Sequence, residues 1–287
     1  MTLSAIPIAI RYILLSAIGF AMMSTCVKTV AGYDIPVLQI IAARASVSLL
    51  LSYLDVRRKR ISVWGNNRWL LVARGTVGTL ALVCIYYAVT KLPLADATVL
   101  QYTHPAFTAI LALVFLGESV KRSTVICIVL SFVGLVVMVR PGAGGAILGL
   151  PTLSLMAALV GAFGSAVAYV LVRRLSQTED SSVIIFYFPL IALPISLILL
   201  GNNFIFPNIE ALLLLLLVGV FTQVGQVGLT KAMAVEAAGK VTSYSYIQVI
   251  FSAILGVILF SEVPTLWTLI GGALIISGAL VNALWKG

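Results

Sequence analysis

Charged residues are scarce in this sequence. Only 9% of its 287 residues are charged and 61% are hydrophobic, and the mean hydropathy is +1.16. Soluble globular domains carry about 25% charged residues, so this composition excludes a soluble domain. The sequence therefore predicts an integral membrane protein.

Histidine and cysteine are also rare. The chain contains one histidine, and its three cysteines, Cys26, Cys84 and Cys127, all lie in apolar segments. An odd number of cysteines in such segments indicates no disulfide framework. A membrane-embedded enzyme would need paired carboxylates, a metal cluster or a nucleophile with a base. With one histidine and no acid in the middle of an apolar segment, we expect no enzyme, no metal and no other cofactor.

Acidic residues are missing from the middle of every apolar segment. All nine lie at segment ends or in connections, namely Asp34, Asp55, Asp96, Glu118, Glu179, Asp180, Glu210, Glu236 and Glu262. Exporters of lipophilic cations commonly need a buried carboxylate, so cationic drugs are disfavoured as substrates. The net charge of +9 comes mostly from basic residues in short connections, a placement that indicates membrane orientation and no nucleic-acid partner.

Apolar segments of membrane-spanning length follow one another along the chain. A helix needs about 20 apolar residues to cross the hydrocarbon core. Cutting the sequence at charged or Pro/Gly/Asn-rich breaks predicts ten spans, at residues 6–27, 35–54, 69–90, 94–116, 123–140, 152–172, 181–200, 211–231, 241–261 and 265–284. The first lacks a basic n-region and a convincing cleavage site, so we expect a span and not a cleaved signal peptide.

The basic residues predict the orientation of these spans. With a cytoplasmic N-terminus, 13 Lys and Arg residues fall on the inner side and three, Lys28, Lys91 and Arg140, on the outer side. Inner connections carry the excess of Lys and Arg in membrane proteins. Both termini are therefore predicted to be cytoplasmic, in a multi-pass protein of a cell (inner) membrane.

An internal repeat divides the chain. Residues 95–138 align without a gap on residues 239–282, at a constant offset of 144 residues. The matched pairs include Thr98 with Thr242, Tyr102 with Tyr246, and Glu118 with Glu262. The predicted halves are residues 1–143 and 144–287, and an odd number of spans per half makes the second half enter the membrane from the opposite side. Inverted repeats are typical of alternating-access carriers. For Glu118 and Glu262 we expect a structural role, in contacts at helix ends or in loops.

The run from Arg74 to Glu118 carries the most specific pattern. It contains a Tyr-Ala pair, the connection Leu-Pro-Leu-Ala-Asp-Ala, a mid-span Pro105 and a terminal Leu-x-Glu. With ten spans in two halves, it resembles the EamA family of the drug/metabolite transporter superfamily over nearly the whole chain. The resemblance implies an all-α fold of two inverted five-helix repeats, and secondary transport of small metabolites, commonly outward. Val249 stands where Pro105 would repeat, so we expect an asymmetric kink.

Two arginines lie inside predicted spans, where a charged side chain is costly. Arg44 is near the middle of the second span. We interpret it as a cavity-facing cation that binds an anionic group, and the alternative is a structural arginine bonded to carbonyls of neighbouring helices. Arg74 lies about 9 Å deep in the third span at a rise of about 1.5 Å per residue. Snorkelling explains that position, which makes Arg74 a secondary candidate.

Polar residues form two related stripes. The stripe of the fourth span consists of Thr98, Gln101, Tyr102, Pro105 and Thr108, with His104 at its border. The stripe of the ninth span consists of Thr242, Ser245, Tyr246 and Ser252, with Gln248 aligned to His104. Helical spacing places each stripe on one face. They predict the lining of a substrate cavity, and the alternative is that they join helices by hydrogen bonds.

Further polar candidates lie in other spans. Gln223 and Gln226 of the eighth span and Tyr244 are candidates for the cavity, whereas the weaker ones are Ser24, Thr25, Ser165 and Tyr169. Near the midplane, His104 alone titrates near neutral pH. It is either a proton-coupling group or a neutral wall residue, since its counterpart Gln248 cannot titrate.

These features predict a secondary active transporter, an exporter or exchanger of a small anionic or zwitterionic metabolite such as an amino acid or organic acid. It would work by alternating access in a lipid bilayer, with a proton or a counter-substrate as coupling partner. The alternatives are a multidrug or nucleoside-type exporter of the same superfamily, or a channel, for which the sequence shows no repeated carbonyl filter or charged ring.

Overall fold

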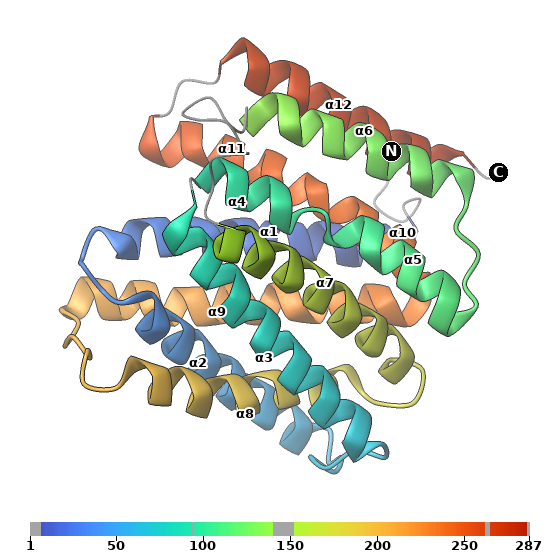
Figure 1. Cartoon of the computed structure of the whole chain (residues 1–287). Coiled ribbons are helices and arrows are strands. Elements are labelled where there is room, and N and C mark those ends of the chain that lie inside the picture. The colour runs from blue at the N-terminus through green and yellow to red at the C-terminus, as the bar shows by residue number, and fades with distance from the viewer. Residues whose placement is uncertain (1–6, 93, 140–151, 262–264, 286–287) are drawn as a thin grey trace. The chain divides into compact units, whose positions relative to one another are not determined.

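Helices account for every regular element in the part of the chain that the structure describes (Figure 1). This computed structural model describes residues 7–92, 94–139, 152–261 and 265–285. The expected boundary between halves at residues 143/144 lies outside these ranges, as do Arg140, Glu262 and Lys286.

Each predicted span corresponds to one helix or to consecutive helices. The continuous spans are α1 (Ile8–Ala31), α2 (Val37–Arg58), α3 (Arg68–Lys91), α6 (Arg122–Val139), α7 (Thr152–Leu175), α8 (Ser181–Leu200), α9 (Ile209–Val235) and α12 (Leu266–Leu284). In the described chain, nine helical segments are long and apolar enough to cross a membrane, and Arg122–Met138 is a shorter apolar helix. The predicted all-α, multi-span fold is confirmed.

The fourth and ninth spans are both interrupted. In the fourth span, two turn residues separate α4 (Leu94–Gln101) from α5 (His104–Leu116). In the ninth, α10 (Ala238–Ser243) continues through the 3-10 helix η3 (Tyr244–Tyr246) into α11 (Ile247–Phe260). The two interruptions differ in form, and the expected asymmetry of the kink stays a prediction. A 3-10 turn tightens the backbone by bonding residues three apart, and it needs no proline.

Helix bounds recur along the chain at the offset of the sequence repeat. Both ends of α1 lie 144 residues before the corresponding ends of α7, and the start of α2 lies 144 residues before the start of α8. The end of α3 has the same relation to the end of α9. We call residues that lie 144 positions apart repeat-equivalent.

Glutamates hold the ends of two helices. Oε2 of Glu118 accepts a hydrogen bond from the backbone N–H of Ala238, where α10 begins, at 2.8 Å. Glu179 accepts from the backbone N–H groups of Asn66 and Asn67 at 2.7 and 2.6 Å, just before α3. The first N–H groups of a helix have no partner within it, so a carboxylate there is stabilising. The structural role predicted for Glu118 is confirmed.

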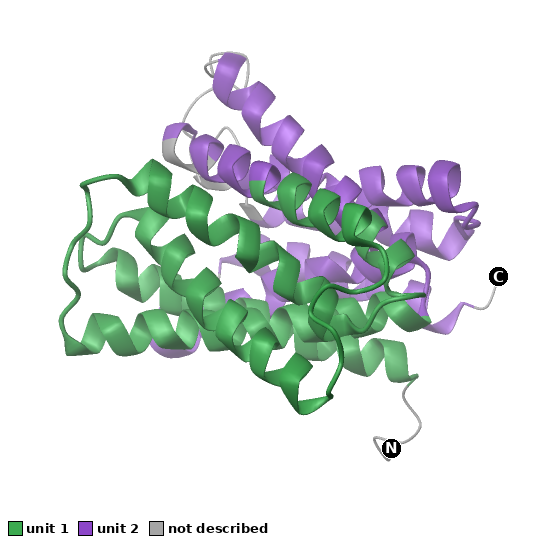
Figure 2. Cartoon of the chain, turned by 90° about the horizontal axis from the view of Figure 1, so that it is seen from below, with its two compact units in different colours: residues 1–79, 171–235 green, residues 80–170, 236–287 purple. Residues whose placement is uncertain are grey.

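The chain forms two compact units (Figure 2). Unit 1 comprises residues 1–79 and 171–235, and unit 2 comprises residues 80–170 and 236–287. In unit 1, α1 packs along α9, and α2 packs along α8 and α9; in unit 2, α6 packs along α12 and α5 packs on α10. Each unit thus contains one helix packed on its repeat-equivalent, α2 on α8 and α6 on α12.

Glycines permit the close approach of α6 and α12. A Cβ atom at Gly271 would overlap the main-chain oxygen of Gly134, and a Cβ atom at Gly134 would lie 2.6 Å from the main-chain oxygen of Gly271. Neighbouring backbone cannot give way as a flexible side chain can. Gly272, by contrast, has nothing within 4 Å of such an atom.

We expect Gly271→Ala to lower the free energy of unfolding by about 1–3 kcal/mol, because the added methyl group overpacks the helix contact. Gly272→Ala is the matched control and should leave stability unchanged or slightly raised, since alanine favours a helix over glycine. Unfolding of the purified protein in detergent measures both variants. Equal stabilities for the two would contradict this packing.

Candidate functional site

Two buried arginines of unit 1 converge on one aromatic ring. Arg44 of α2 is 8% exposed and Arg74 of α3 is 4% exposed. Their guanidinium Cζ atoms lie 5.9 and 4.7 Å from the ring centroid of Phe188 in α8. A guanidinium within about 6 Å of a ring centroid is attracted by the negative face of the ring, by roughly 2 kcal/mol when water is excluded. We call Arg44, Arg74 and Phe188 the arginine cluster.

The arginine cluster lies where repeat-equivalent helices meet. Arg44 and Phe188 are themselves repeat-equivalent, so α2 and α8 contact each other at the same position along each helix. Two residues related by a rotation can contact each other only near the rotation axis, so this contact lies close to the pseudo-symmetry axis that relates α2 to α8. Carriers built from repeats bind their substrates near the midplane at the interface between repeats.

Glycines of α3 allow Arg74 to turn inward. A Cβ atom at Gly75 would lie 2.7 Å from the main-chain oxygen of Tyr187, and one at Gly78 would lie 3.1 Å from Nη1 of Arg74. These glycines therefore let α3 approach α8 and leave room for the guanidinium. Because Arg74 is buried against Phe188, the snorkelling interpretation of this residue is wrong. Depth along a span does not reveal which face of the helix a side chain occupies.

The arginine cluster concentrates positive charge. Two unit charges ~10 Å apart repel each other by roughly 1.7 kcal/mol at an effective dielectric constant of about 20. Four of the five acids of unit 1 have other partners: Asp55 and Asp180 pair with Lys59, Glu210 accepts a hydrogen bond from Tyr33, and Glu179 accepts from backbone N–H groups before α3. The fifth, Asp34, lies in the connection after α1. The electrostatic field around the cluster therefore favours a negatively charged group.

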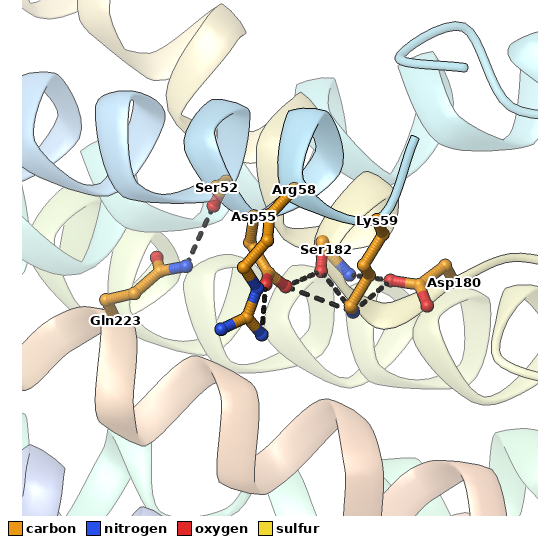
Figure 3. A network of polar contacts seen from close by, with 7 residues as sticks. All are labelled: Ser52, Asp55, Arg58, Lys59, Asp180, Ser182 and Gln223. Atoms are coloured by element: carbon orange, nitrogen blue, oxygen red, sulfur yellow. Dashed lines mark hydrogen bonds and ion pairs between the residues drawn. The ribbon is translucent and has the colours of Figure 1, made fainter. Parts of the chain in front are cut away.

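Two glutamines of α9 have different surroundings. Oε1 of Gln226 accepts a hydrogen bond from Nη2 of Arg74 at 3.5 Å, a long contact that places Gln226 beside the arginine cluster. Gln223 accepts from Ser48 at 2.5 Å and donates to Ser52 at 2.9 Å, and Figure 3 shows its amide directed at Ser52 of α2. Gln223 thus has the contacts expected of a residue that joins helices.

A charged network joins the end of α2 to the start of α8 (Figure 3). Lys59 Nζ lies 3.0 Å from Asp55 and 2.8 Å from Asp180, and Ser182 donates to Asp55. Burial raises the pKa of Asp180, but hydrogen bonds from Lys59 and Ser182 outweigh it and hold this pKa below its ordinary value. Asp180 therefore adds stability above its unfolded pKa of about 3.9, and that stability is lost as the pH falls through the folded-state pKa. The network is structural.

An aromatic cluster of unit 2 surrounds His104. Its ring centroid lies 5.9 Å from that of Tyr102 and 5.2 Å from that of Tyr169. Nδ1 of His104 is buried and has no hydrogen-bond partner within the described chain. The ring of Tyr246 lies 5.5 Å from that of Tyr102, and its hydroxyl donates to the main-chain oxygen of Tyr102 at 2.7 Å. Tyr102 and Tyr246 are repeat-equivalent, so equivalent residues meet in unit 2 as well.

The remaining residues of the predicted stripes lie in unit 2 with varied contacts. Hydroxyls of Thr242 and Ser245 bond to main-chain oxygens three or four residues earlier, as small hydroxyls often do in helices. The hydroxyl of Tyr244 is buried and has no hydrogen-bond partner among the described residues. Thr98, Gln101 and Gln248 are half-buried, and Pro105 is buried in the first turn of α5.

Sequence reasoning missed Phe188 and gave Tyr169 little weight. A phenylalanine in an apolar span resembles one that faces lipid, and only its repeat equivalence to Arg44 could have singled it out. The three small hydroxyls grouped with Tyr169 do bond to their own helices, at Ser24, Thr25 and Ser165. Tyr169 differs because its ring packs edge-on against His104.

Comparison with known proteins decides the family. The EamA-like transporter family matches residues 7–140 and again residues 152–284. The chain belongs to this family. This EamA-like protein is therefore a multi-span membrane transporter of the drug/metabolite transporter superfamily, and membership implies a small-molecule substrate and a surrounding lipid bilayer.

Relatives of this EamA-like transporter match nearly its whole length. The pseudopaline exporter CntI of Pseudomonas aeruginosa is 32% identical over 287 residues, which cover 100% of this chain and 99% of that protein. Solute carrier family 35 member G1 of Homo sapiens is 32% identical, over 95% of this chain and 77% of that protein. A solved crystal structure with 18% identity has a TM-score of 0.86 over 96% of each chain and thus shares the fold.

We expect Tyr246→Phe to lower the free energy of unfolding by about 0.6–1.7 kcal/mol, the mean and the maximum found for hydrogen bonds inside a membrane bundle. The substitution removes the donor to the main-chain oxygen of Tyr102 and keeps the ring. Tyr244→Phe is the matched control, because its hydroxyl has no hydrogen-bond partner to lose among the described residues. Unfolding in mixed detergent measures both variants. A loss for Tyr244→Phe as large as that for Tyr246→Phe would count against this role.

Proposed function

We propose that this transporter is a secondary active carrier that exports or exchanges a small anionic or zwitterionic metabolite, such as an amino acid or organic acid. The arginine cluster carries this proposal. Arg44 and Arg74 are buried cations beside Phe188, at the contact between repeat-equivalent helices. Guanidinium groups form strong, frequently bidentate hydrogen bonds with carboxylates, which suits Arg44 to anion binding.

The distribution of acids supports an anionic substrate over a cationic drug. Every Asp and Glu in the described part of the chain lies near the end of a span or in a connection. A lipophilic cation would therefore find no carboxylate at the middle of a span, and it would be repelled by the arginine cluster. The 32% identity to CntI, a pseudopaline exporter, supports outward movement of a metabolite.

In this proposal, transport uses alternating access. The two repeat halves, residues 1–143 and 144–287, move against each other so that the substrate site opens first to one side of the membrane and then to the other. Both termini are cytoplasmic and the protein resides in a cell inner membrane, because the inner connections carry most of the Lys and Arg residues. Either a proton or a counter-substrate drives transport. His104, Gln101 and Gln248 remain candidates for the polar lining that the sequence predicts.

We expect Arg44→Gln to weaken binding of a carboxylate metabolite at least about tenfold, since removing a charged hydrogen-bond donor costs roughly 1.5–3 kcal/mol. Binding to purified full-length protein, measured by calorimetry against amino acids and organic acids, gives the result. Arg57→Gln is the matched control, because Arg57 is an exposed arginine near the end of the same helix. Arg44→Lys, which keeps the charge, should retain part of the affinity.

Unchanged carboxylate binding in a folded Arg44→Gln protein would contradict the proposed anion site. Thermal unfolding of each variant establishes that it is folded before binding is compared. Equal losses for Arg57→Gln and Arg44→Gln would also count against the site, because they would reflect net charge and not position.

A further inference from the structure

We infer that Arg44 and Arg74 act as one two-cation site, which takes a substrate bearing two acidic groups. This inference rests on the proposed transport of an anion and adds the number of its charges. The chemical class is a dianion, such as a dicarboxylate, in which each guanidinium contacts one acidic group.

The shared ring sets the separation of the two cations. Cζ of Arg44 and Cζ of Arg74 lie 5.9 and 4.7 Å from the same Phe188 centroid. The two Cζ atoms are therefore no farther apart than the sum of those distances. A small dicarboxylate can span such a gap with one carboxylate on each guanidinium, because an Arg–carboxylate contact itself covers part of the distance.

Each arginine is held by a different helix. Arg44 belongs to α2 and Arg74 to α3, while Phe188 belongs to α8. A site fixed on three helices is preorganised for both acidic groups, which reduces the entropy lost on binding. Both side chains are more than nine-tenths buried, so neither is a surface charge screened by solvent.

The charge of the site comes from the first half of the chain alone. Phe188 is the repeat-equivalent of Arg44, and the buried Val218 is the repeat-equivalent of Arg74. Both equivalents are apolar, so the second half adds no compensating acid at either position. A dianion can place one acidic group on each guanidinium, whereas a monocarboxylate has only one to offer.

Gln226 serves as a positioning residue for this site. Its Oε1 accepts a hydrogen bond from Nη2 of Arg74. An amide is neutral, so it orients the guanidinium without cancelling its charge. Gln226→Leu should therefore reduce the preference for a dianion without abolishing the binding of a single carboxylate.

The test compares acids that differ by one charge. Succinate and its monoamide, succinamate, have similar size and shape, and malonate, glutarate and adipate vary the distance between the acidic groups. Calorimetric titration of the purified full-length protein gives the affinity for each. We expect the best dicarboxylate to bind at least about tenfold more tightly than its monoamide, and we expect Arg74→Gln to bring this ratio close to one.

The outcomes separate the two-cation site from the proposed function. If Arg74→Gln leaves the ratio unchanged while Arg44→Gln weakens both acids, the two-cation site is wrong and the anion carrier stands. If the wild-type protein binds the monoamide as tightly as every dicarboxylate, or binds none of the dicarboxylates, the two-cation site is also overturned. If neither arginine variant changes any affinity, both proposals fail. The matched control for Arg74→Gln is Arg68→Gln, because Arg68 is an exposed arginine at the start of the same helix.

Discussion

The burial of two guanidinium groups is the constraint on which the organisation of unit 1 depends. A charged side chain at the centre of a bilayer costs roughly 2.5–3.5 kcal/mol on insertion scales, and two of them together also repel each other. The ring of Phe188 offsets part of this cost by attracting both cations. Gly75 and Gly78 make the arrangement sterically feasible, because larger residues would keep α3 away from α8.

Repeat equivalence links this constraint to function. In unit 1, Arg44 meets its equivalent Phe188, and in unit 2, Tyr102 meets its equivalent Tyr246. The bounds of α1 and α7 match at both ends, and α2 and α8 begin at equivalent residues, whereas Tyr102 lies in a turn and Tyr246 in a 3-10 helix. The side chains differ, with a cation facing a ring in one unit and two tyrosines in the other. Repeat-equivalent positions thus carry different side chains, and the positive charge at these contacts belongs to unit 1.

The spans could be predicted from the sequence because long apolar runs leave few alternatives for a backbone that must satisfy its own hydrogen bonds in lipid. The interruption at Tyr244–Tyr246 could not, since a 3-10 turn needs no proline and leaves no mark in composition. Arg44 could be singled out because a charge in the middle of a span is rare. Arg74 was misjudged because its depth permits snorkelling, and the inward turn depends on packing against α8. Gln223 could not be told from Gln226, because only the position of Ser48 and Ser52 on α2 decides which amide joins helices.

The central claim is that an anion bound by the arginine cluster is carried across the membrane by alternating access. Counterflow in proteoliposomes tests it most directly. Vesicles containing the purified transporter are loaded with unlabelled succinate, and the entry of radiolabelled succinate is followed over time and concentration. We expect saturable entry that internal succinate accelerates and that Arg44→Gln abolishes. Entry that rises linearly with concentration and ignores the internal anion would contradict it.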